Sequence, residues 1–150
     1  MALPISSQDI PPSGKFLVDA AILQQLINQG NFPTTKYTKN TTSGATTAAA
    51  GDLTGADVCN AEYSAVGAAN LTTRTAAQMA ADLGVNFYVG FSWEILIVNT
   101  SGGTTTLVGG TGVTITGTAT LATNTTRRFV ATFTSATAVT LQSVAVGTIS

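Results

Sequence analysis

Apolar and polar residues alternate with a period of two along most of the second half of the chain. In residues 88–98 one parity is entirely apolar, and its residues are Val89, Phe91, Trp93, Ile95 and Ile97. Successive side chains of a strand point to opposite faces, so this pattern predicts a strand with one face in a core. The same reasoning predicts strands at 104–108, 113–121, 127–134 and 138–146, with Val113, Ile115, Phe129, Ala131 and Phe133 facing inward.

Short turns rich in Gly, Ser and Thr separate these strands. They fall at 101–103, at Gly109–Gly110 and at 135–137, and we expect the first to close a hairpin. Two further strands are predicted at 52–54 and 58–63. Strands at this spacing indicate a mainly-β protein, an antiparallel β-sandwich of jelly-roll-like type. A β-helix is not expected, because we find no fixed repeat.

One or two short helices are predicted as well. In residues 75–84, Thr75 and Gln78 have the spacing of a capping box and Gly84 is placed to end the helix. In residues 15–29, Phe16, Ala20, Leu23 and Ile27 form one apolar stripe. This second helix either packs in a core or docks on a partner.

The region before the sandwich has a different composition. Pro4, Pro11 and Pro12 exclude a helix in residues 1–14, which we interpret as an extended arm. Residues 34–50 are low in complexity and carry no period, so a loop or surface connector is expected there. The predicted organisation is therefore an arm, helix and connector at 1–50, followed by a β-sandwich domain at 51–150.

Few residues are charged. Charged residues make up 9% of the chain and the net charge is −1, so no general attraction to nucleic acid or to an anionic membrane is expected. Either partners cover much of the surface, or hydroxyl groups keep the protein soluble. No window of about 20 residues is continuously apolar, which predicts no membrane-spanning segment. The first residues lack the features of a signal peptide and there is one cysteine, so we expect folding in a cytoplasm without an intrachain disulfide.

The chemistry-bearing residues do not suggest an enzyme. The chain has no histidine, which rules out Ser-His-Asp and Cys-His constellations. Asp52 and Asp57 lack the alternating ligands of a calcium loop, and Cys59 is expected to be a small buried residue. A pair of carboxylates from distant segments is the one enzymatic alternative left open. We predict no catalytic residue, no cofactor and no metal.

Two arginines stand side by side in an otherwise uncharged stretch. On a strand, Arg127 and Arg128 point to opposite faces. One is placed to pair with Glu94 across the sheet, and the other to reach a carboxylate on a neighbouring subunit. The alternative is that both are solvated. Nucleic-acid binding is not expected, because neither a basic patch nor an aromatic platform accompanies them.

Four segments of the chain form a further pattern. They are the strand ending in Asn99-Thr100, the sequence GTGVTITGT at 110–118, the sequence TNTTRRF at 123–129 and the sequence FTSATAVTL at 133–141. Together they resemble a Thr- and Gly-rich β-domain of tailed-bacteriophage virion proteins. The helix at 75–84 fits the same pattern, and the resemblance covers residues 71–144. It implies a structural protein with no catalytic residues. The domain occurs in head decoration (cement) proteins and in other virion proteins.

We therefore expect a non-enzymatic capsid decoration protein on the outer surface of a phage head, where it binds the major capsid protein as a homotrimer and stabilises the lattice. The residues expected to contact partners are Ile5, Asp9, Pro11, Pro12, Phe16, Arg127 and Arg128. The alternative is a tail or fibre module that binds a cell-surface glycan. Glycan sites usually show an exposed aromatic cluster. Phe87, Phe91 and Trp93 fall on the core parity, which argues against that alternative.

Overall fold

The computed structural model describes residues 35–148, which belong to one compact unit of the chain. The arm at 1–14 and the helix at 15–29 lie outside the described residues, so both stay predictions.

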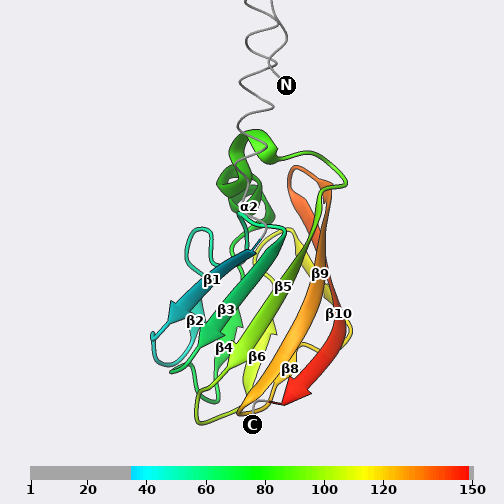
Figure 1. Ribbon diagram of the computed structural model, residues 1–150. Helices are drawn as coiled ribbons and strands as arrows, with labels where there is room; N and C mark the ends of the chain where they lie inside the picture. The colour runs from blue at the N-terminus through cyan, green and yellow to red at the C-terminus, as the bar shows by residue number, and fades with distance from the viewer. Residues whose placement is uncertain (1–34, 149–150) are drawn as a thin grey trace, which may run out of the picture. The chain divides into compact units, whose positions relative to one another are not determined.

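Two mixed β-sheets face each other and form a β-sandwich (Figure 1). This confirms the mainly-β class that the period-two pattern predicted. The larger sheet has the order β1-β3-β5-β9-β10-β7, and its strands are β1 (Thr35–Asn40), β3 (Val58–Tyr63), β5 (Ser92–Asn99), β9 (Thr125–Ser135), β10 (Ala138–Thr148) and β7 (Val113–Thr116). The smaller sheet has the order β2-β4-β6-β8, with β2 (Thr46–Thr47), β4 (Asn70–Thr72), β6 (Thr105–Val108) and β8 (Thr120–Leu121).

The chain crosses from one sheet to the other after each of the strands β1 to β8. As a result β1, β3 and β5 are parallel neighbours in the larger sheet, and β2, β4 and β6 are parallel neighbours in the smaller one. The expected all-antiparallel, jelly-roll-like pairing is therefore corrected to mixed pairing. The turn at 101–103 connects β5 to β6 in the other sheet and does not close a hairpin. The first six strands thus alternate between the two sheets, although the sequence has no fixed repeat.

Antiparallel pairing joins β6 to β8 in the smaller sheet and three strands of the larger sheet. Strands β9 and β10 form a hairpin, and β9 also pairs with β5. The turn predicted at 135–137 closes this hairpin, which confirms that part of the sequence analysis. The parity predicted for β9 is confirmed too, because Phe129, Ala131 and Phe133 are fully buried.

The hydrophobic core lies between the two sheets. Trp93, Ile95 and Ile97 of β5 face inward, as predicted, and Leu107 and Leu121 contribute from the smaller sheet. These residues belong to one continuous cluster, so burial of apolar area from both sheets stabilises the sandwich as a single unit.

The helix α2 (Ala76–Leu83) covers one end of the sandwich (Figure 1). Thr75 Oγ1 accepts a hydrogen bond from the Gln78 backbone N–H at 3.2 Å, and the Gln78 side chain accepts one from the Thr75 N–H at 3.1 Å. The predicted capping box is confirmed, as is Gly84 at the C-terminal cap. A helix this short is marginal alone and needs packing, which its buried Ala76, Met79 and Leu83 provide.

Four local expectations are wrong. The single strand predicted at 113–121 is divided into β7 in the larger sheet and β8 in the smaller one. Residues 35–40 and 46–47 form β1 and β2 instead of a loop, and residues 52–54 form a turn instead of a strand. The long strand predicted from residue 85 begins only at Ser92, after the short helix η1 (Gly84–Asn86) and a loop. Gly90 has a φ of +93°, which is not an extended conformation, so Val89 before it is not part of the strand.

The glycines at 109–112 form a tight turn, as the sequence indicated. A Cβ on Gly112, whose φ is +77°, would lie 2.1 Å from the carbonyl oxygen of Thr137. Only glycine permits this contact, and the adjoining Val139 N–H donates to the Gly112 carbonyl at 2.9 Å. The turn therefore brings β7 alongside β10.

Candidate functional site

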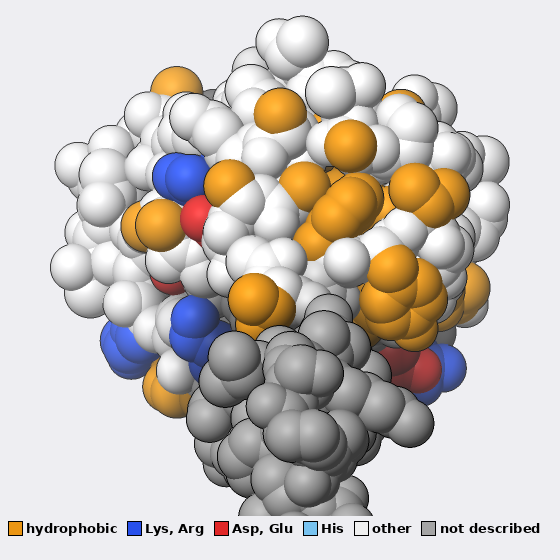
Figure 2. Space-filling model, turned by 90° about the horizontal axis from the view of Figure 1, so that it is seen from above, with side chains coloured by type: hydrophobic (Ala, Val, Ile, Leu, Met, Phe, Trp, Pro, Cys, Tyr) orange, Lys and Arg blue, Asp and Glu red, His pale blue; other side chains and the backbone are white. Residues whose placement is uncertain are grey.

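An exposed apolar patch lies at the α2 end of the sandwich. It consists of Val85, Tyr88 and Val89, whose exposed fractions are 59%, 59% and 60%. Figure 2 looks onto this end of the molecule and shows hydrophobic side chains exposed there. Exposed apolar side chains that gather in one place mark surfaces that bind partners more often than single ones do.

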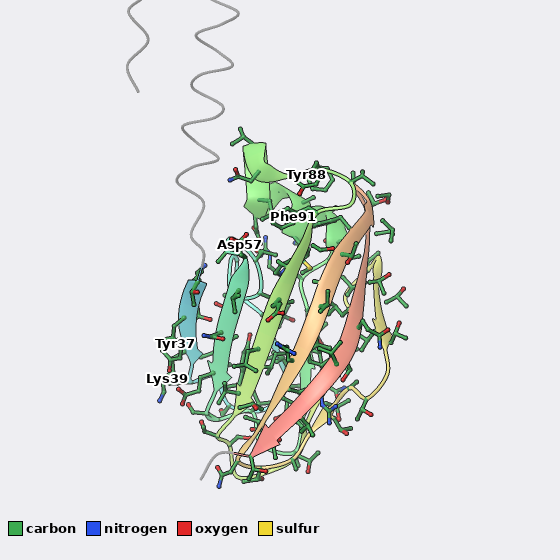
Figure 3. The ribbon with its side chains drawn as sticks, turned by 45° about the vertical axis from the view of Figure 1, so that its right-hand side comes forward. Tyr37, Lys39, Asp57, Tyr88 and Phe91 are labelled. Atoms are coloured by element: carbon green, nitrogen blue, oxygen red, sulfur yellow. The ribbon has the colours of Figure 1, made fainter. Side chains whose placement is uncertain are left out.

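The apolar patch rests on an aromatic cluster that continues into the core. Tyr88 meets Phe91 edge-on with ring centroids 5.4 Å apart, and Phe91 stacks on Trp93 at 5.5 Å (Figure 3). Trp93 in turn stacks on Phe133, and its indole N–H donates to the Leu53 carbonyl at 2.7 Å. This packing supports the patch from beneath.

Backbone hydrogen bonds hold the loop that carries the patch. The Gly90 N–H donates to the Phe133 carbonyl at 2.8 Å, and the Phe133 N–H donates to the Phe91 carbonyl at 3.0 Å. These bonds therefore extend the pairing of β5 with β9 into the loop. It presents Tyr88 and Val89 in a fixed arrangement, which favours binding because little conformational entropy is then lost.

The two arginines have different surroundings. Arg128 Nη1 lies 3.4 Å from Glu94 Oε2 on the outer face of the larger sheet, so the predicted pairing across the sheet is confirmed. Arg127 lies on the same side of β9 as the inward-facing Phe129, near the end of the sandwich. Its Nε donates to the Thr120 carbonyl at 2.9 Å and its Nη1 donates to the Ser143 hydroxyl at 3.1 Å. Arg127 thus links β9 to β8 and β10, and its contact with a second subunit stays a prediction.

A polar cluster lies on β1 and β3 at the edge of the larger sheet (Figure 3). The Tyr37 hydroxyl donates to Glu62, Lys39 Nζ lies 2.9 Å from Glu62 Oε1, and the Thr100 hydroxyl donates to the same oxygen at 3.0 Å. The hydrogen bond from Tyr37, followed by that from Lys39, lowers the pKa of the Glu62 carboxyl from 4.5 to about 2. Glu62 is therefore a charged acceptor and cannot serve as a proton donor near neutral pH.

A second polar network holds the turn before β3 against α2. Arg74 Nη2 donates to Asp82 Oδ1 at 3.2 Å, with Nε 3.0 Å from Oδ2. Asp82 also accepts from the Gly51 N–H at 3.3 Å, and Asp52 accepts from the Tyr63 hydroxyl at 3.3 Å. Burial raises the pKa of Tyr63 above its ordinary value. Each of these contacts fixes a loop or an element end, so the network is structural.

The remaining sequence candidates add no chemistry to these surfaces. Cys59 is buried as predicted, and burial raises the pKa of its thiol to about 11. Asp57 is exposed, and its backbone carbonyl accepts from the Glu94 N–H at 2.8 Å. Within residues 35–148 no group of three or more Cys, Asp or Glu residues is arranged to hold a metal ion. No helix in that same range is long and apolar enough to cross a membrane.

Five of the predicted contact residues lie outside the described residues. They are Ile5, Asp9, Pro11, Pro12 and Phe16, and their roles stay predictions. Sequence analysis missed the apolar patch, because the period-two pattern assigned Val89 to the core. The available signal was the pair Gly84 and Gly90, which bracket the segment and both take positive φ.

Comparison with known proteins gives no relative for this chain. No protein-family model, no curated protein and no solved structure matches it.

Proposed function

We propose that the chain is a non-enzymatic structural protein of a phage virion, a decoration protein that binds the major capsid protein on the outside of the head. The observation that carries the proposal is the apolar patch of Val85, Tyr88 and Val89. A patch of this kind is suited to burial against another protein, since removing apolar surface from water is favourable. The resemblance of residues 71–144 to virion β-domains supports the same class of function.

The charge distribution on the outer face of the larger sheet also supports this proposal. Arg128 pairs with Glu94, and Lys39 pairs with Glu62, so the charges there are neutralised within the protein. Thr126, Thr132 and Thr134 lie on the same face and carry only hydroxyl groups. A surface without unpaired charges can be buried against a partner without the large desolvation cost of isolated ions.

The first experiment measures how many copies of the protein a purified virus particle contains. Quantitative mass spectrometry of particles from the source of this sequence should find it at an abundance comparable to that of the coat protein. A few copies per particle would instead place it in the tail. Its absence from the particles would overturn the proposal.

The second experiment tests the apolar patch directly. The purified variant Val85→Asp/Val89→Asp should lose binding to heads that lack the protein, because two charges would then have to be buried. The control is Thr41→Asp/Thr42→Asp, which adds the same charge to an exposed loop. Both variants are checked for native circular dichroism. Equal binding by the two variants would remove the patch from the proposal.

A third experiment tests the arm. Removal of residues 1–14 should leave the sandwich folded and abolish head binding if the arm bridges neighbouring capsid subunits. Full occupancy by the shortened protein would contradict that role.

A second candidate function, recognition of a cell-surface glycan by a tail or fibre module, is favoured by one observation. Tyr37 is 60% exposed, and the hydrogen bond from its hydroxyl to Glu62 fixes its ring beside Lys39. An oriented aromatic ring can contact the apolar side of an amphipathic ligand, and the polar groups beside it can contact the polar side. Glycan-array binding that Tyr37→Ala abolishes and Tyr88→Ala retains would establish this alternative.

A further inference from the structure

Strand β10 extends well beyond its neighbour β7. It pairs with β9 along its whole length, from Ala138 to Thr148, but with β7 only over Val139–Gln142. The reason is that β7 ends at Thr116, and Gly117, with a φ of +85°, turns the chain toward the smaller sheet. Within the described part of the chain, residues 143–148 therefore have a strand on one side only.

The two outer edges of the larger sheet differ in how they are protected. The opposite edge, β1, carries Lys36 and Lys39, and lysines on an edge strand oppose pairing with another chain. Residues 143–148 of β10, with the sequence SVAVGT, carry no charge and no proline. They expose Val144 and Val146 at 48% and 61%. An uncharged, valine-bearing edge of this kind is suited to strand addition.

A β-bulge precedes the free segment. The register shifts between Ser143 and Ala145, after which pairing with β9 runs without a break from Ala145 to Thr148. The shift places Val146 opposite Arg127, whose guanidinium is held by the Thr120 carbonyl and the Ser143 hydroxyl. The segment after the bulge is thus a regular strand supported by a fixed neighbour.

We propose that this free edge pairs with the same edge of a second copy of the chain, antiparallel and centred on Val146. The backbone donors and acceptors of an antiparallel pair are self-complementary, so one segment can occupy both sides of a two-fold axis. Two uncharged segments meet without repulsion, and the contact covers Val144 and Val146 of both copies. The larger sheets of the two copies then form one continuous sheet. This inference does not depend on the proposed function, and it predicts a dimer where the sequence analysis expected a trimer.

The test is the mass of the full chain in solution by light scattering coupled to size-exclusion chromatography. The wild-type protein should have twice the mass of one chain. Val144→Lys/Val146→Lys should have the mass of one chain, because it places like charges on both sides of the axis. The matched control Val85→Lys/Val89→Lys changes two valines elsewhere that are also exposed and should remain a dimer. A wild-type monomer or trimer, or a monomeric control, would overturn the inference.

Cross-linking provides a second measurement that does not depend on the lysine variant folding. Val146→Cys should form a disulfide-linked dimer under mild oxidation, since residue 146 of one copy lies opposite residue 146 of the other across the two-fold axis. Val89→Cys is the control and should not. The native Cys59 does not interfere, because it is buried and its thiol pKa is raised to about 11. Equal cross-linking of the two variants would contradict pairing at β10.

Discussion

The side-chain amide of Asn99, at the end of β5, donates to the backbone carbonyl of Leu121 in β8 at an N···O distance of 3.0 Å. This hydrogen bond joins the two sheets. The same amide lies 2.9 Å from the Gly103 carbonyl, and its oxygen accepts from the Ser101 N–H at 3.0 Å. Asn99 is fully buried, so it fixes the point at which the chain leaves the larger sheet and enters the smaller one.

Replacement of Asn99 should strongly destabilise the protein. Asn99→Leu removes the donors for the carbonyls of Gly103 and of Leu121 in the smaller sheet, and we expect a loss of about 3 kcal/mol in the free energy of unfolding. Urea denaturation followed by tryptophan fluorescence measures it. Asn70 is exposed, and Asn70→Leu should change stability by less than about 0.5 kcal/mol. Similar effects at both positions would contradict the bridging role of Asn99.

The capping box of α2 should contribute a measurable part of the stability. Thr75→Ala removes the hydroxyl that accepts from the Gln78 N–H, and we expect a loss of about 1 kcal/mol. Thermal and urea denaturation measure the loss. Thr118→Ala changes an exposed threonine outside the helix and serves as the control. No difference between the two variants would show that packing alone holds α2.

Stability should depend on pH through Glu62. Its pKa is lower in the folded protein, about 2, than its usual value of 4.5. The stabilisation is therefore complete above about pH 4.5 and disappears as the pH falls toward 2. The wild-type protein should be more stable than Glu62→Gln at pH 7, and the difference should vanish near pH 2. Urea midpoints measured across this range provide the test, and a difference independent of pH would refute the assignment.

The two adjacent arginines should differ in their contributions. Arg127→Ala removes hydrogen bonds to Thr120 and Ser143 and should cost about 1 kcal/mol. Arg128→Ala removes a pair with Glu94 whose side chains are 48% and 40% exposed, so its effect should be a few tenths of a kcal/mol. Added salt should reduce only the Arg128 effect. Denaturation at low and high salt measures both losses of stability. A larger loss for Arg128→Ala than for Arg127→Ala would contradict this prediction.

Local sequence patterns determined the individual elements. The capping residues around α2 and the parity of Trp93, Ile95 and Phe129 were sufficient to place a helix and two strands, because capping and alternation involve residues near one another in the chain. The turn between β9 and β10 was also readable, since it joins two strands that are adjacent in sequence.

The tertiary structure alone decided which sheet each strand joined. The turn at 101–103 has the composition of a hairpin turn, but Asn99 binds carbonyls of Gly103 and Leu121 and directs the chain into the other sheet. Residues Thr35–Asn40 likewise form β1 because they gain β3 as a parallel partner that is remote in sequence. The exposure of Val89 follows from the Gly90 N–H bonding to Phe133 in β9. A period of two specifies which side chains share a face, whereas strand partners and sheet edges depend on contacts between residues far apart in the chain.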